Sequence, residues 1–277
     1  MKITRLAASA ALALAAGVLA NAAAPLAQDS GAAPPVPPPP PATPVPVNPP
    51  RAGSGQPAPP SPAAVARGRK AFDRYCISCH GLEGDGRGPT ADWIDPRPRV
   101  LTSGTFKFRS TPSGELPTDA DILRTITNGL HGTYMPRWAP ITGRERADLV
   151  QFVKSLSQRF ATEAQSPSIA IPPRPPFGPQ LVKQGGDVWR KMQCAACHGD
   201  TGKGDGSSAQ TLRDDWGYPI PPHDFTRGPL KVGDAPEDLY RTFMTGLNGS
   251  PMPSYADTLS PDDAWALVAY VRTLRKE

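Results

Sequence analysis

The chain has 277 residues, a formal net charge of +5 and 37 prolines. This length allows one large domain or two domains of roughly 100 to 150 residues, and so many prolines argue against one continuous core. A nucleic-acid-binding protein is not expected, because the sequence has no basic stripe with interleaved aromatic residues.

The first 27 residues are predicted to be a secretory signal peptide. Lys2 and Arg5 precede an apolar run from Leu6 to Ala20, and small residues that suit cleavage follow at 20–22, with later alternatives near Ala27. The run is shorter than the ~20 apolar residues that a spanning helix needs. We therefore expect export to the periplasm, with an uncleaved anchor that keeps the protein on the membrane as the alternative.

Residues 28–62 are predicted to form a disordered spacer. The prolines of this segment all lie between Pro34 and Pro62, and no periodic apolar pattern interrupts them. Such a segment cannot bury enough apolar surface to offset the entropy of ordering, so we expect an extended, polyproline-like linker.

The remainder of the chain contains one layout twice, in residues 63–160 and 179–277, and such repetition decides the architecture. The pairs that match are Val65, Gly68 and Phe72 with Val182, Gly185 and Trp189; Gly84-Asp85-Gly86 with Gly204-Asp205-Gly206; 121–125 with 238–242; 129–136 with 246–253; and 149–156 with 267–274. Apolar residues recur at helical spacing, and no segment shows the alternation typical of strands. We predict an all-α fold of two tandem domains. The segment 161–178 joins them as a linker stiffened by proline, in which Ile169, Ile171 and Phe177 are available to pack on a domain.

All four cysteines lie in two Cys-x-x-Cys-His strings, which begin at Cys76 and Cys194. This string is the attachment signature of haem c: both thiols form thioethers with the porphyrin, and the adjacent histidine, His80 or His198, binds the iron from one face. Export would favour a disulfide, but the exclusive use of all four cysteines in these two strings needs another chemical reason. A zinc site or dithiol redox chemistry remain as alternatives, but each string is followed by a histidine and recurs in an exported helical module with the same downstream layout. We therefore expect two covalently attached haem c groups, held by Cys76, Cys79 and His80 and by Cys194, Cys197 and His198.

The second axial ligand of each iron is predicted to be a methionine. Met135 and Met252 occupy matched positions before a proline in a glycine-rich loop, whereas Met244 and Met192 have no such match and suit core packing. His131 and His223 are competing ligands, but neither is repeated in the other domain, and a lone loop histidine is usually solvated or hydrogen-bonded.

An iron with histidine and methionine ligands has no vacant position for a substrate, so the predicted activity is outer-sphere electron transfer. No catalytic residue and no small-molecule substrate are expected. Several aromatic residues of the loops suit the pockets or a docking face, although we favour ordinary core packing for each: Trp93, Tyr134, Trp138, Trp216 and Tyr255.

The sequence resembles class I c-type cytochromes, and in particular di-haem periplasmic cytochromes c, over residues 63–160 and 179–277. The two Cys-x-x-Cys-His strings and the Met135-Pro136 and Met252-Pro253 pairs carry the resemblance. It implies a small helical fold around each haem, with crossing N- and C-terminal helices. It also implies electron transfer between respiratory or dehydrogenase proteins as redox partners.

One segment departs from the repeat. Residues 105–117 form a longer loop than residues 229–236, and Lys107 and Arg109 make it basic, which suits a haem propionate or a partner. A subunit of a larger oxidoreductase or oxidase complex and a di-haem peroxidase remain as alternative functions. A thiosulfate-oxidising cytochrome with a cysteine-ligated haem would need a fifth cysteine, which the chain lacks.

Overall fold

The computed structural model describes residues 60–275, which all fall within one compact unit, Pro39–Glu277. The predicted signal peptide at 1–27 and nearly all of the spacer at 28–62 lie outside the described residues. The described part is helical, and within residues 60–275 the only β feature is an isolated bridge between Arg213 and Pro219. The prediction of an all-α fold is confirmed. No helix in this part of the chain is long and apolar enough to cross a membrane.

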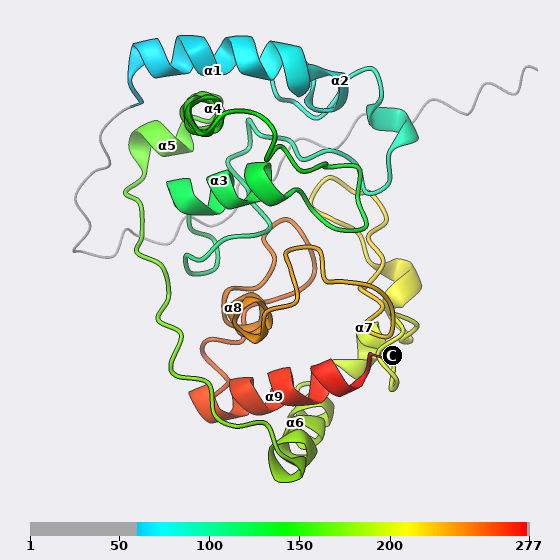
Figure 1. Ribbon diagram of the computed structural model, residues 1–277. Coiled ribbons are helices and arrows are strands. Elements are labelled where there is room, and N and C mark those ends of the chain that lie inside the picture. Colours follow the sequence, from blue (N-terminus) through cyan, green and yellow to red (C-terminus); the bar gives the residue numbers. More distant parts are fainter. Residues whose placement is uncertain (1–59, 276–277) are drawn as a thin grey trace, which may run out of the picture. The chain divides into compact units, whose positions relative to one another are not determined.

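Within residues 60–275, each repeat has four corresponding α-helices and one 3-10 helix, and the first repeat has one further short α-helix. Figure 1 labels the α-helices. The first repeat contains α1 Pro62–Tyr75, α2 Ile77–His80, η1 Ala91–Trp93, α3 Asp119–Asn128, α4 Gly143–Ser155 and α5 Arg159–Thr162. The second repeat contains α6 Pro179–Lys191, α7 Ala195–His198, η2 Ala209–Thr211, α8 Pro236–Thr245 and α9 Pro261–Thr273.

The first and last long helices of each repeat cross in close contact. Figure 1 shows α1 running across α4, which is seen end-on, and α6 packs against α9 in the same way. Gly68 and Gly185 lie at the two crossings: a Cβ atom on Gly68 would lie 2.1 Å from the carbonyl oxygen of Asp148, and one on Gly185 only 1.9 Å from that of Ala266. The absence of a side chain therefore allows the backbones to approach.

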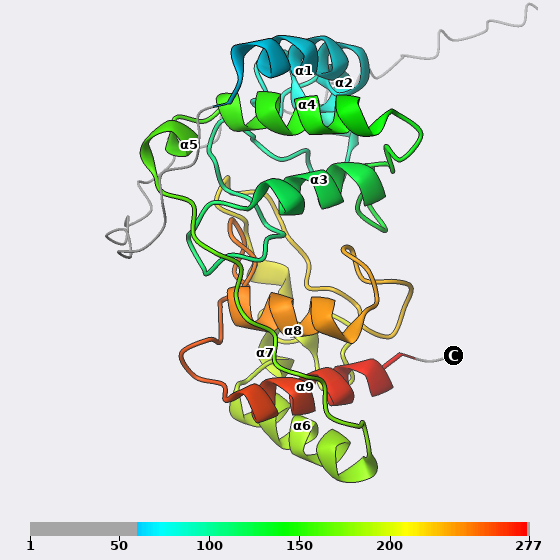
Figure 2. The same ribbon diagram turned by 60° about the vertical axis from the view of Figure 1, so that its left-hand side comes forward.

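A hydrophobic core lies beneath each crossing. In the first repeat Phe72 of α1 meets Phe152 of α4 with ring centroids 4.9 Å apart, and in the second Trp265 of α9 meets Tyr240 of α8 at 4.7 Å. Figure 2 shows α3 beneath α4 and α8 beside α9, so each middle helix closes one side of its core.

Two glycines end the middle helices and turn the chain towards the methionine loops. Gly129 follows α3 and Gly246 follows α8, both with a φ of +65°, in the left-handed region that favours glycine. In both repeats the methionine loop therefore begins directly after the glycine that ends the middle helix.

The correspondence between the glycine loops of the two repeats differs from the predicted one. The N–H of Gly86 donates to the carbonyl of the motif histidine at 2.8 Å, and in the second repeat it is Gly204 that makes this bond, also at 2.8 Å. The partner of Gly84-Asp85-Gly86 is thus Gly202-Lys203-Gly204. The predicted pairing with residues 204–206 was wrong by two residues, because glycine recurs at every second position in both loops and the sequence leaves their register ambiguous.

The linker between the repeats is bound along its length. The N–H of Ile169 donates to the carbonyl of Ser110 at 2.8 Å, the side chain of Gln165 donates to the carbonyl of Pro117 at 2.7 Å, and Ile171 packs against the core of the second repeat. Phe177 lies 6.3 Å from Trp265 between ring centroids.

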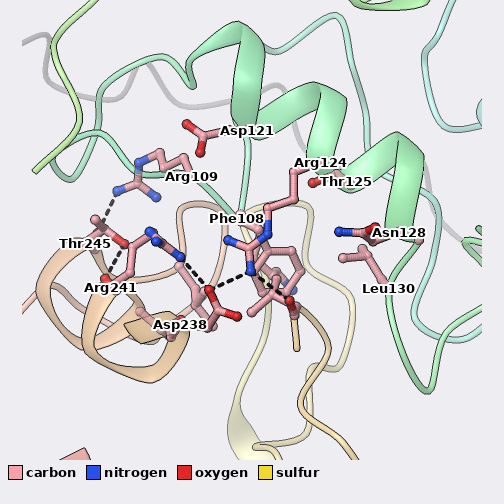
Figure 3. A pocket seen from close by; sticks show the side chains of 15 residues that line it. Phe108, Arg109, Asp121, Arg124, Thr125, Asn128, Leu130, Asp238, Arg241 and Thr245 are labelled. Carbon is pink, nitrogen blue, oxygen red and sulfur yellow. Dashed lines mark hydrogen bonds and ion pairs between the residues drawn. The ribbon is translucent and has the colours of Figure 1, made fainter. Parts of the chain in front are cut away.

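Charged side chains join the two repeats (Figure 3). Arg109, from the long loop of the first repeat, is only 3% exposed and donates to the carbonyl oxygens of Thr245 at 2.6 Å and Gly246 at 3.4 Å. These carbonyls lie at the C-terminal end of α8, where a cation is favoured. Nearby, Asp238 of α8 forms ion pairs with Arg124 of α3 at 2.5 Å and with Arg241 at 2.6 Å.

The helix crossing predicts that Gly68→Ala destabilises the first repeat. An added methyl group would overlap the backbone of α4, and overpacking of this kind costs about 1–3 kcal/mol. The midpoint of urea unfolding, followed by far-ultraviolet circular dichroism, should fall. Gly143→Ala is the matched control, since the nearest atom to its Cβ is 4.0 Å away. Equal stability of the two variants would contradict the role given to Gly68.

The contacts of Arg109 with α8 predict that the variant Arg109→Met has a less stable C-terminal turn of α8. The buried carbonyls of Thr245 and Gly246 would lose a charged donor, and bonds of this type contribute about 1.5–3 kcal/mol. Amide hydrogen exchange in the last turn of α8 should become faster, while Arg144→Met, at an exposed position of α4, should leave it unchanged. Unchanged exchange in Arg109→Met would show that Arg109 does not hold the repeats together.

Candidate functional site

The two cysteine strings form the same local structure. Each follows a long helix and makes one short helical turn, in which the N–H of the motif histidine donates to the carbonyl of the first cysteine at 2.9 Å in both repeats. None of the four cysteines forms a disulfide. Burial raises the pKa of Cys76 to about 12 and that of Cys194 to about 11.

The two motif histidines are held by backbone carbonyls. Nδ1 of His80 donates to the carbonyl oxygen of Arg99 at 3.1 Å, and Nδ1 of His198 donates to that of His223 at 3.2 Å. Burial is the main cause that lowers the pKa of both imidazoles. Because a carbonyl oxygen only accepts, Nδ1 carries a proton, and the neutral ring that burial favours has its lone pair on Nε2. A metal-bound histidine has this form, and its second nitrogen is commonly fixed by such a bond.

A large cavity lies beside His80. Its volume is about 1110 Å³, above the roughly 300–1000 Å³ typical of pockets for small molecules and cofactors. Cys76, Cys79, His80 and Met135 all line it, so the structure brings together the predicted attachment and ligand residues of the first repeat. The apolar part of the wall includes Phe72, Ile122, Ile126, Leu149 and Val153. Two thiols, an imidazole, a thioether and apolar walls fit a haem of the c type.

The methionine loops have the same geometry in both repeats. The N–H of Leu130 donates to the carbonyl of Met135 at 3.0 Å, and that of Leu247 donates to the carbonyl of Met252 at 3.0 Å. The Met252 side chain packs against the hydrophobic cluster that contains Cys194. Met192 and Met244 also pack there, as expected for residues that fill a core.

The competing histidines have other surroundings. His131 is exposed, and its N–H donates to the carbonyl of Lys231 at 3.0 Å. His223 is half-buried and contributes its carbonyl to the second site, while its own Nε2 is buried without a hydrogen-bond partner among residues 60–275. The positioning role of Arg99 and His223 was missed by sequence analysis, because any residue type can supply a backbone carbonyl.

The aromatic residues divide into two groups. Trp138 packs on Tyr75 with ring centroids 5.2 Å apart, Trp216 lies under the guanidinium of Arg99, and Tyr255 packs against the second core. Trp93 is 85% exposed and Tyr134 65% exposed. The prediction of core packing was therefore wrong for Trp93 and Tyr134.

The alternative of a zinc site has no ligand set in the part of the chain that the structure describes. No group of three or more His, Cys, Asp and Glu side chains within residues 60–275 could hold a metal ion together.

The family model described as "Cytochrome C oxidase, cbb3-type, subunit III" matches the chain at residues 63–153 and again at 180–271. The chain belongs to this family of c-type cytochromes. Haem c bound covalently is therefore its cofactor. The two matched segments coincide with the two helical repeats of this cytochrome.

Two curated relatives are also named as cytochrome c subunits. The cbb3-type cytochrome c oxidase subunit FixP of Azorhizobium caulinodans is 26% identical over 219 residues, which cover 76% of this chain and 60% of the relative. The cytochrome bc1 complex cytochrome c subunit of Mycobacterium leprae is 26% identical over 223 residues, with 78% and 64% covered. This cytochrome thus spans less than two thirds of the length of the curated relatives it matches.

A solved structure is more similar. A chain of the reducing HAO-like protein complex of Kuenenia stuttgartiensis superposes with a TM-score of 0.75 and 43% sequence identity. The match covers 76% of this cytochrome and 96% of that chain.

Proposed function

We propose that this protein is a di-haem c-type cytochrome that transfers electrons between protein partners in the periplasm. The observation that carries the proposal is the duplicated site: both repeats hold a motif histidine through Nδ1 and present a methionine from an equivalent loop. A single accidental Cys-x-x-Cys-His string would not explain this second, matched set of contacts.

Each repeat has a complete set of residues for one haem. Cys76 and Cys79 would form the thioethers in the first repeat, and Cys194 and Cys197 would form them in the second. His80 with Met135, and His198 with Met252, would bind the two irons. A bound haem would supply the change between ferrous and ferric iron that electron transfer requires. The chain fixes the ligands and excludes water through the apolar wall around Phe72 and Leu149.

The same ligand sets argue against an enzyme. A di-haem peroxidase needs one iron that can open a coordination position, whereas two equivalent methionine loops would close both. The protein therefore has no catalytic residue and no small-molecule substrate, and its partners are redox proteins.

A second candidate is a subunit of a larger oxidoreductase or oxidase complex. The names of the similar proteins favour it, because each describes a subunit or a complex. A haem-staining band that migrates with a larger complex on a native gel, and only there, would support this candidate over a freely diffusing carrier.

Attachment of two haems predicts the haem content of cysteine variants. Replacing Cys76 and Cys79 together by serine should reduce the covalently bound haem from two per chain to one. The same double replacement of Cys194 and Cys197 should also leave one. The pyridine haemochrome assay on denatured, purified protein measures this ratio. Ser78→Ala, inside the first string but without a thiol, should retain two haems. A content that does not depend on the cysteines would overturn the proposal.

The axial ligands predict the spectra of methionine variants. Met135→Ala should remove about half of the methionine-to-iron charge-transfer absorption of the oxidised protein and lower one of two reduction potentials, because methionine ligation raises the potential. Met252→Ala should act on the other haem. Met244 is a core methionine of the second repeat, like Met252. The variant Met244→Ala is the control and should keep the full charge-transfer absorption and both reduction potentials. Turnover of hydrogen peroxide by the wild-type protein would instead favour a peroxidase.

A further inference from the structure

Five cationic side chains line the cavity of the first repeat. Arg87 is exposed and Arg97 is paired with Asp92, which leaves Arg99, Lys107 and Lys231. Arg99 and Lys107 belong to the first repeat, and Lys231 belongs to the second. The cavity is therefore not built by one repeat alone. Trp216 and Tyr218 of the second repeat also line it.

Backbone contacts hold Lys231 at this wall. Its carbonyl oxygen accepts a hydrogen bond from the N–H of His131 at 3.0 Å, and the carbonyl of the next residue, Val232, accepts one from Nη2 of Arg124 at 3.0 Å. Both donors belong to the first repeat, so the main chain that directly follows the Lys231 side chain is fixed against the domain whose cavity it lines.

Trp216 holds the guanidinium of Arg99. The Arg99 carbon Cζ lies 4.5 Å from the centroid of the Trp216 ring, a distance typical of a cation–π contact. The same arginine carries the carbonyl that orients His80. Arg99 is thus fixed at its carbonyl by the imidazole of His80 and at its guanidinium by Trp216 of the second repeat.

The three cations form no ion pair with another described residue. Nη1 of Arg99 is buried without a hydrogen bond within residues 60–275, and no ion pair there involves Arg99, Lys107 or Lys231. Carboxylates act on them from beyond ion-pair distance: Asp214 and Asp215 on Arg99, Asp95 on Lys231 and Asp214 on Lys107. Burial, with a smaller effect of Arg99 and Lys231, still lowers the pKa of Lys107 to about 7. A buried cation is costly unless an opposite charge is in direct contact with it.

We propose that Arg99, Lys107 and Lys231 together bind the propionate carboxylates of the haem in the first repeat. The second repeat thereby completes the first haem site. This inference rests on the proposed function, since it requires a haem in the first cavity. The propionate carboxylates would supply the direct ion pairs that these cations lack within residues 60–275, and guanidinium and ammonium groups are the usual partners of carboxylates.

The variant Lys231→Met, prepared as the full-length holoprotein, tests this site. Removing a positive charge from a propionate should lower the reduction potential of one haem, the one whose methionine absorption is lost in Met135→Ala. The redox-induced infrared difference spectrum should also show a shifted carboxylate stretch, assigned with isotope-labelled haem propionates. Lys107→Met should act on the same haem.

Lys183→Met is the matched control, since this lysine of α6 in the second repeat has an 82% exposed side chain. It should leave the potentials and the carboxylate bands unchanged. A potential shift in Lys231→Met no larger than in this control, or unchanged carboxylate bands, would overturn the inference. A wild-type potential that follows phosphate concentration at constant ionic strength would assign the cations to a soluble anion and would also overturn it.

The haem content separates this test from that of the proposed function. Lys231→Met should retain two covalently bound haems per chain, because its thioether cysteines are intact. A wild-type protein with fewer than two haems would instead refute the proposed function, before any potential is compared.

Discussion

The close crossing of the terminal helices is the constraint on which both sites depend. Gly68 and Gly185 bring the backbones of the paired helices within contact distance of each other. Since α1 and α6 lead directly into the cysteine strings, the crossing fixes where those strings begin. The closing helices α4 and α9 then cover the cores beside the motif histidines, so a larger residue at either glycine would displace the wall of a haem site as well as a helix.

Within each repeat, the functional side chains depend on backbone groups more than on neighbouring side chains. The imidazoles of His80 and His198 are oriented by carbonyls, and the methionine loops are closed by the N–H groups of Leu130 and Leu247. Such contacts are insensitive to residue identity. This explains why Arg99 in one repeat and His223 in the other can perform the same task.

The contacts between the two repeats involve the long loop of the first repeat, residues 105–117. Arg109 lies at the C-terminal end of α8, so it serves the second repeat, while Lys107 of the same loop lines the first cavity. The sequence suggested that both basic residues of this loop bind a haem propionate or a partner. Arg109 instead joins the two repeats, and only Lys107 belongs to the proposed propionate site. The two repeats are consequently not equivalent in the charged side chains around their cysteine strings.

The sequence by itself determined the helical class, the duplication and the family, because apolar periodicity and the repeated Cys-x-x-Cys-His string are local patterns. It also singled out His80 and Met135, which the cavity of the first repeat brings together. Only the tertiary structure decided the register of the glycine loops, the exposure of Trp93 and Tyr134, the carbonyls of Arg99 and His223, and the entry of Lys231 into the first cavity. These features come from contacts between distant segments, in which backbone groups or the other repeat take part, and no local residue pattern encodes them.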